Sequence, residues 1–168
     1  MHLVRDALPE ARGRALLRVV GVGNPWRSDD AAGLHAARAL RDALPDGAEV
    51  LEEGGEPTAL LDAFAGVDAL WLVDAVSSGA AAGTVHRLEA GSQELPAELF
   101  RTSTHHLGLA EAVELGRALG RLPARVVVFG IEGANFDPGD SLTPVVADAV
   151  ATVARQVSEE VAACTKKP

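Results

Sequence analysis

The feature that most constrains the fold is a run of five consecutive apolar residues, Ala69 to Val73, which ends abruptly at Asp74. A strand with one face in water alternates apolar and polar residues, whereas a strand covered on both faces is apolar throughout. We therefore predict that this run is a fully buried strand near the centre of a sheet, and that Asp74 follows it.

Other short apolar runs alternate along the chain with segments whose apolar residues recur at helical spacing. The further predicted strands are Leu16–Val20, Val50–Leu51 and Arg125–Ile131. The predicted helices are 29–44, Pro57–Phe64, His105–Leu119 and Pro144–Ala163. Alternation of strands and helices predicts an α/β fold, a three-layer αβα sandwich around a mainly parallel sheet.

One strand is expected to run against the others. The segment 77–83 is too short to hold a helical crossover, which a parallel connection requires. The strand Thr84–Leu88 that follows should therefore be antiparallel to its neighbours. His86 and Arg87 within it suit a position at the edge of the sheet.

Length and charge exclude several classes of protein. The 168 residues predict a single domain, with 1–14 as an N-terminal arm and 164–168 as a tail. A net charge of −9 without a Lys/Arg cluster disfavours nucleic acid and anionic membranes as partners. No apolar run is long enough to span a membrane, and residues 1–14 lack the apolar region of a secretion signal. We expect a cytoplasmic protein.

Three residues fall where the predicted elements begin or end at the carboxyl edge of the sheet, where such folds bind ligands. These are Asp30, Asp74 and one histidine of the adjacent pair His105 and His106. Each of these residues has a simpler structural explanation when taken alone. Asp30 and its neighbour Asp29 could cap a helix, Asp74 could stabilise a turn, and the histidine could be an exposed residue in the first turn of a helix. One acid of the pair can also cap while the other faces the ligand. Together, two carboxylates and an imidazole suit a divalent cation such as Zn²⁺, Ni²⁺ or Co²⁺ in an open site.

Other chemistries find less support. The turn Gly21–Gly23 begins like a dinucleotide-binding fingerprint, but Trp26 stands where the third glycine would be needed. The chain has no P-loop, no H-E-x-x-H and no G-x-S-x-G motif. Its one cysteine, Cys164, lies in the predicted tail and is expected to be inert. Ser103 and His105 are too close in a helix start to face each other as nucleophile and base.

Three blocks of sequence, GVGNPWRSDDAAG, LWLVDAV and STHHLGLAEA, occur in this order along the chain. Together they resemble the [NiFe]-hydrogenase maturation endopeptidases, over a region from about Leu16 to the final helix. The resemblance implies a small α/β peptidase with a five-stranded mixed sheet, one strand antiparallel. It also implies removal of a short C-terminal extension from a hydrogenase large-subunit precursor after nickel insertion.

The resemblance further implies the site residues. Asp30, Asp74 and His105 match the positions that bind the nickel of the precursor and carry the catalysis, with His105 rather than His106 as the ligand. Some members of the family have Glu at the position of Asp30, and many have Asp at that of Glu53. No nucleotide cofactor is implied, and we expect a monomer whose nickel is carried by its substrate.

Two mechanisms and two other functions remain open at this point. The metal could polarise the scissile carbonyl or a bound water, or one carboxylate could activate water while nickel serves only as a recognition signal. The alternative function is a non-catalytic metallochaperone or assembly factor on the same fold. A nucleotide-dependent enzyme that uses the Gly21–Gly23 turn is a more distant alternative.

Overall fold

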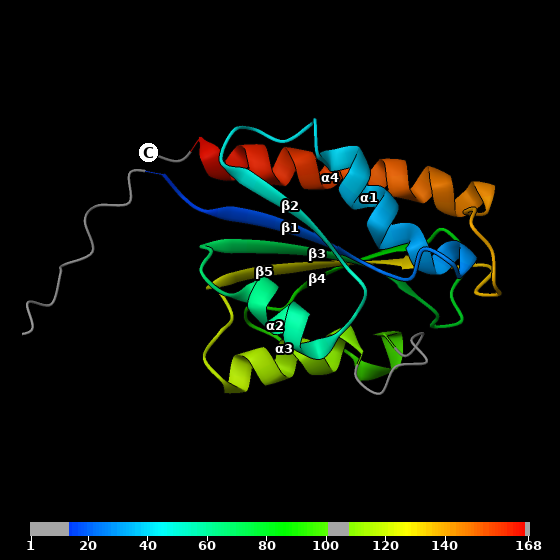
Figure 1. Cartoon of the computed structure of the whole chain (residues 1–168), viewed down its shortest axis with the longest axis horizontal. Helices are drawn as coiled ribbons and strands as arrows, with labels where there is room; N and C mark the ends of the chain where they lie inside the picture. The colour runs from blue at the N-terminus through cyan, green and yellow to red at the C-terminus, as the bar shows by residue number, and fades with distance from the viewer. Residues whose placement is uncertain (1–13, 101–107, 167–168) are drawn as a thin grey trace, which may run out of the picture.

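The computed structural model describes residues 14–100 and 108–166. Its elements are, in order, β1 (Leu17–Val22), the 3-10 helix η1 (Ser28–Ala31), α1 (Ala32–Leu40), β2 (Ala48–Glu53), α2 (Pro57–Phe64), β3 (Ala69–Val76), β4 (Val85–Glu89), the 3-10 helix η2 (Ala97–Phe100), α3 (Leu109–Ala118), β5 (Arg125–Glu132) and α4 (Pro144–Thr165). The strands form one sheet in the order β2-β1-β3-β5-β4 (Figure 1). Among the described residues, no helix combines the length and apolarity that crossing a membrane requires.

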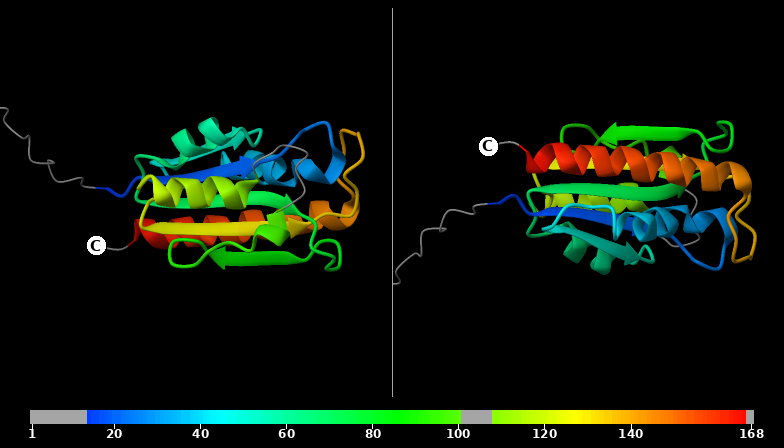
Figure 2. Two further views of the ribbon diagram at one scale, coloured as in Figure 1. Left: turned by 90° about the horizontal axis from the view of Figure 1, so that it is seen from below. Right: turned by 90° about the horizontal axis from the view of Figure 1, so that it is seen from above.

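The sheet lies between two layers of helices, as predicted. Helices α1 and α4 cover one face, and α2 and α3 cover the other (Figures 1 and 2). All neighbouring strands are parallel except β4, which pairs antiparallel with β5 at the edge of the sheet. The predicted αβα sandwich and the antiparallel edge strand are therefore confirmed.

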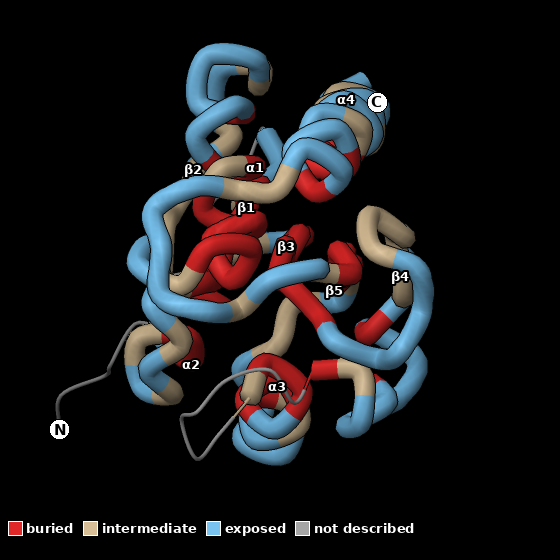
Figure 3. The backbone as a smooth tube through the Cα atoms, turned by 90° about the vertical axis from the view of Figure 1, so that its right-hand side faces the viewer, coloured by how far each residue is buried: buried red, intermediate tan, exposed pale blue. Residues whose placement is uncertain are grey.

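Strand β3 is the centre of the core, with β1 on one side and β5 on the other. All eight of its residues are buried, and the buried segments cluster around it in Figure 3. Leu70 and Leu72 pack under α2 and α3, while Trp71 and Val73 pack under α1 and α4. The strand does not end at Val73 as predicted, because pairing with β5 continues to its last residue.

Two predicted helices differ from the structure. The segment predicted as one helix over 29–44 is divided into η1 and α1, and α1 ends at Leu40. Ser28 has a positive φ of 50°, which is incompatible with a regular α-helix. The N–H of Asp29 donates to the carbonyl of Asn135, in the loop between β5 and α4, instead of bonding within a helix. The first part of the segment therefore forms only a 3-10 turn. Helix α3 begins at Leu109 rather than at the predicted His105, because Gly108, its N-cap, has an extended backbone with a ψ of 176°; His105 itself lies outside the described residues.

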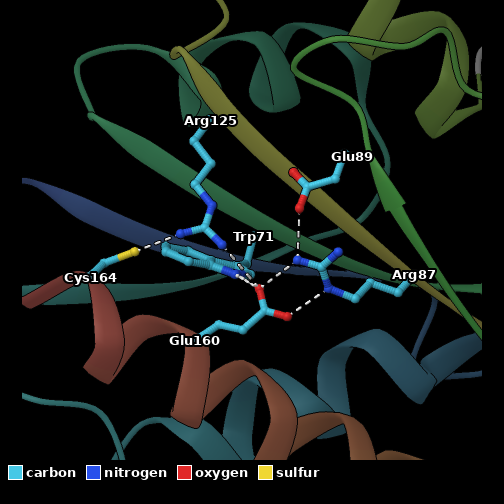
Figure 4. Close-up of polar contacts among 6 residues, drawn as sticks. All are labelled: Trp71, Arg87, Glu89, Arg125, Glu160 and Cys164. Atoms are coloured by element: carbon cyan, nitrogen blue, oxygen red, sulfur yellow. Dashed lines mark hydrogen bonds and ion pairs between the residues drawn. The ribbon is translucent and has the colours of Figure 1, made fainter.

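Helix α4 is fastened to the sheet by a cluster of polar contacts near the amino-terminal ends of the strands (Figure 4). The Glu160 carboxylate accepts hydrogen bonds from Trp71 Nε1 at 2.9 Å and from Arg87 Nε at 2.6 Å. The Arg125 guanidinium lies over the Trp71 ring and donates to Cys164 Sγ. Cys164 is thus part of α4 rather than of a tail, because this contact and its partial burial extend the helix.

At the other end of the sheet, Gly33 lets α1 approach β1 and β3 at backbone distance. A Cβ atom on Gly33 would lie 2.2 Å from the Val73 carbonyl oxygen and 2.3 Å from that of Val22. No side chain fits between helix and sheet there. The close approach sets the start of α1 directly against the carboxyl ends of the two strands.

We predict that Gly33→Ala lowers the free energy of unfolding by about 1–3 kcal/mol or more, because the added methyl group forces α1 away from the sheet. Urea denaturation measures the change. Gly54→Ala is the matched control, since a Cβ there meets nothing within 4 Å. An equal, small effect of both substitutions would contradict the proposed close contact.

Candidate functional site

The site lies at the carboxyl ends of β1 and β3, which we call the switch-point edge. After β1 the chain turns through α1 to β2 on one side, whereas after β3 it continues to β4 and β5 on the other. Ligands of open α/β sheets bind where neighbouring strands diverge in this way. Figure 3 views the molecule from this end of the parallel strands.

Two predicted site residues, Asp30 and Asp74, lie at this edge. Asp30 belongs to η1, which follows the loop after β1, and Asp74 lies in β3 opposite Gly130 of β5. Their side chains are only 7% and 8% exposed. The sheet thus brings together two acids that are 44 positions apart in the sequence, each nearly removed from water.

The two carboxyl groups influence each other electrostatically. Burial, and after it the negative charge of Asp30, raises the pKa of Asp74 well above its ordinary value. The backbone N–H of Ala75, which donates to Asp74 Oδ1 at 2.8 Å, opposes this increase only in part. Carboxylates that are buried and repel each other favour either a proton or a cation between them.

His105, the third predicted site residue, lies with His106 outside the described residues. The described elements on either side of it are η2 and the start of α3. These two elements pack together, and η2 also contacts β3, the strand that carries Asp74. Within residues 14–100 and 108–166, no three His, Cys, Asp or Glu side chains group closely enough to hold a metal ion.

Asp29 does not cap the helix that follows it but binds the loop between β5 and α4. Its carboxylate is fully buried and accepts hydrogen bonds from the N–H groups of Ala134 (2.9 Å), Asn135 (2.9 Å) and Thr143 (2.8 Å). The Thr143 hydroxyl donates to it as well. Burial alone would raise the pKa of Asp29, but these hydrogen bonds outweigh it and lower the pKa.

Backbone hydrogen bonds reinforce this contact between the two loops. Ser28 N–H donates to the Gly139 carbonyl, and Asp29 N–H donates to the Asn135 carbonyl, both at 3.0 Å. The positive φ of Ser28 is held by these contacts. The backbone that carries Asp30 is therefore fixed by a segment more than a hundred residues away in the sequence.

The sequence analysis missed a fourth buried acid, Glu132, which ends β5. Its side chain is 2% exposed and accepts hydrogen bonds from Ser78 N–H (2.6 Å), the Ser78 hydroxyl (2.8 Å) and Gly79 N–H (3.2 Å). His86 Nε2 lies 3.2 Å from the same carboxylate. Glu132 thus holds the loop that follows β3. A signal was present, since this acid comes directly after an apolar strand, as Asp74 does.

Comparison with known proteins gives consistent matches. A family model described as hydrogenase maturation protease matches residues 34–160. Hydrogenase 2 maturation protease of Escherichia coli (strain K12) is 36% identical over 144 residues, which cover 83% of this chain and 86% of that protein. Hydrogenase expression/formation protein HupD of Thiocapsa roseopersicina is 30% identical over 131 residues, which cover 75% of this chain and 58% of that protein.

The fold is also shared with a solved structure. The hydrogenase maturating endopeptidase HybD from E. coli superposes with a TM-score of 0.76 and 32% sequence identity. The superposition covers 88% of this chain and 92% of that one. The similarity therefore extends over most of the chain.

We predict that Glu132 makes the stability of the fold depend on acidity. Burial raises the pKa of Glu132, but the hydrogen bonds from Ser78, His86 and Gly79 outweigh it and lower the pKa below the ordinary value of a glutamate. A carboxyl group whose pKa is lower in the folded state stabilises the fold above its unfolded pKa, and this contribution is lost as the pH falls through the folded pKa.

Glu132→Gln should therefore cost about 1–3 kcal/mol at neutral pH and less in acid, because the charged acceptor of several buried donors is lost. Urea denaturation between about pH 7 and pH 3 measures the free energy of unfolding of the wild type and of Glu132→Gln as a function of pH. This window brackets the titration of a carboxyl group. The exposed Glu159→Gln serves as the control. Parallel curves for wild type and Glu132→Gln would show that Glu132 has no such role.

Proposed function

The chain belongs to the hydrogenase maturation protease family, and we propose that Asp30, Asp74 and His105 form the site at which it cleaves its substrate. As a member it is an endopeptidase, a hydrolase that removes the C-terminal extension of a hydrogenase large-subunit precursor. One observation carries the assignment of the site: two nearly buried carboxyl groups, from the ends of β1 and β3, interact at the switch-point edge.

We propose that nickel carried by the precursor binds at this pair. A divalent cation between Asp30 and Asp74 removes the repulsion that raises the pKa of Asp74. Carboxylate oxygens and an imidazole nitrogen form a ligand set that Ni²⁺ accepts. The sequence motif makes His105 the third ligand. In this arrangement nickel belongs to the substrate and marks a precursor that is ready to be cleaved.

The same acids can promote hydrolysis of the peptide bond. Asp74 Oδ1 is held by Ala75 N–H, and burial raises the pKa of this carboxyl, which makes its ionised form a stronger base than an ordinary carboxylate. We propose that a carboxylate oxygen not bound to nickel takes a proton from water as the water oxygen bonds to the scissile carbonyl carbon. The proton then passes to the peptide nitrogen as the C–N bond breaks, so the reaction is of the aspartic type.

The partner and setting follow from the same reasoning. We propose that the chain acts in the cytoplasm as a monomer, with the large-subunit precursor as its one macromolecular partner. The net charge of −9 supports the absence of nucleic-acid or anionic membrane partners, because either would be repelled. No nucleotide cofactor is proposed.

We predict that Asp30→Asn and Asp74→Asn each reduce processing at least about a hundredfold, the contribution expected of a positioned acid or base. Neither should lower the melting temperature, because each removes one of two repelling, buried charges. Intact mass of the precursor and a thermal melt give both values. Asp29→Asn is the control: it should lose stability, because four donors lose their charged acceptor. Processing at the wild-type rate by either site variant would remove that residue from the site.

We predict that His105→Ala abolishes processing and that His106→Ala leaves most of it. The sequence motif assigns the ligand position to His105 and gives His106 no role in binding the metal. The experiment is the same mass measurement, with thermal melts to show that both variants fold. The reverse result would shift the ligand by one residue.

The proposal as a whole is tested with nickel-loaded and nickel-free forms of the precursor. We predict that only the nickel-loaded form loses a defined C-terminal peptide, because the metal bridges substrate and protease. Equal cleavage of both forms would contradict the role of nickel. A stable complex without cleavage would instead indicate a binding module, the alternative that the sequence left open.

A further inference from the structure

Trp26 lies in solvent at the switch-point edge. Its side chain is 71% exposed, whereas the only other tryptophan, Trp71, is fully buried. Exposed apolar side chains are common on protein surfaces, but an indole is the largest of them and is energetically costly to leave in water. Trp26 stands four residues before Asp30, in the loop that joins β1 to η1.

The backbone at Trp26 is fixed on both sides. Its N–H donates to Asn24 Oδ1 at 2.9 Å, and its carbonyl accepts a hydrogen bond from Gly139 N–H at 2.9 Å. The next residue, Arg27, pairs with Gly139 in a β-bridge. The indole is therefore presented to solvent by a rigid loop. Because this backbone is already ordered, a partner that covers the indole gains apolar burial with little additional loss of backbone entropy.

We propose that Trp26 is the apolar anchor to which the large-subunit precursor docks, through an apolar side chain close to its cleavage point. This inference rests on the proposed function. The loop that carries the indole leads into η1, which carries Asp30, so a polypeptide whose scissile bond reaches Asp30 comes to the segment that begins with Trp26. Tryptophan is also the residue type that most often dominates the energy of a protein interface.

The test separates binding from catalysis, using the nickel-loaded precursor that the wild-type chain cleaves. Trp26→Ala should raise KM about tenfold while kcat changes less than about twofold, since a tryptophan at the centre of an interface contributes at least this much. Trp26→Phe should keep most of the affinity. The matched control is Leu119→Ala, because Leu119 is 55% exposed but lies at the far end of α3, before β5 begins.

The fold of both Trp26 variants can be checked directly. Each keeps Trp71 as its one tryptophan, so an unchanged blue fluorescence emission shows that the core is intact. An unchanged KM in Trp26→Ala, or a loss confined to kcat, would overturn the inference. So would a wild-type dimer that Trp26→Ala converts to monomers, since a second copy would then cover the indole. Failure of the wild-type chain to cleave any precursor would overturn the proposed function instead.

Discussion

The geometry of the switch-point edge depends on the buried carboxylate of Asp29. A charge removed from water is tolerated only when hydrogen bonds replace its hydration, and four donors from the loop between β5 and α4 do so here. These bonds join two loops that are distant in sequence and hold Ser28 at a positive φ. Asp30 follows directly, so its position is a consequence of the bonds that its neighbour makes.

Three of the four buried acids at this end of the sheet show how environment shifts the pKa of a carboxyl group in opposite directions. Asp29 and Glu132 each accept several hydrogen bonds, and the pKa of each is lowered. Asp74 accepts one from Ala75 and faces the charge of Asp30, and its pKa is raised. The hydrogen bonds to the first two stabilise their charged forms, whereas burial beside a like charge disfavours the charged form of the third. Such opposed shifts are typical of sites that carry acid–base chemistry.

The sequence predicted what local patterns determine and missed what distant contacts determine. The bounds of Pro57–Phe64 matched because proline fixes the first turn of a helix, and the antiparallel edge strand followed from a short connection. The role of Asp29 could not be read, because its partner Thr143 is 114 residues away. Asp30 and Asp74 were found from their places at the ends of predicted elements, although β3 extends to Val76 because β5 continues to pair with it.

Two helices fix the site from opposite directions. The position of helix α1 is fixed by the contact of Gly33 with the backbone of β3. A side chain at Gly33 would clash with the carbonyl of Val73, the residue before Asp74. Helix α4 has 22 residues, about 33 Å of helix at 1.5 Å per residue, and spans the sheet. Glu160 fastens its far end to Trp71 and Arg87, while Thr143 binds Asp29 at its near end. Both helices thus hold the backbone that carries Asp30 and Asp74, and the two carboxyl groups lie near enough for the charge of Asp30 to raise the pKa of Asp74.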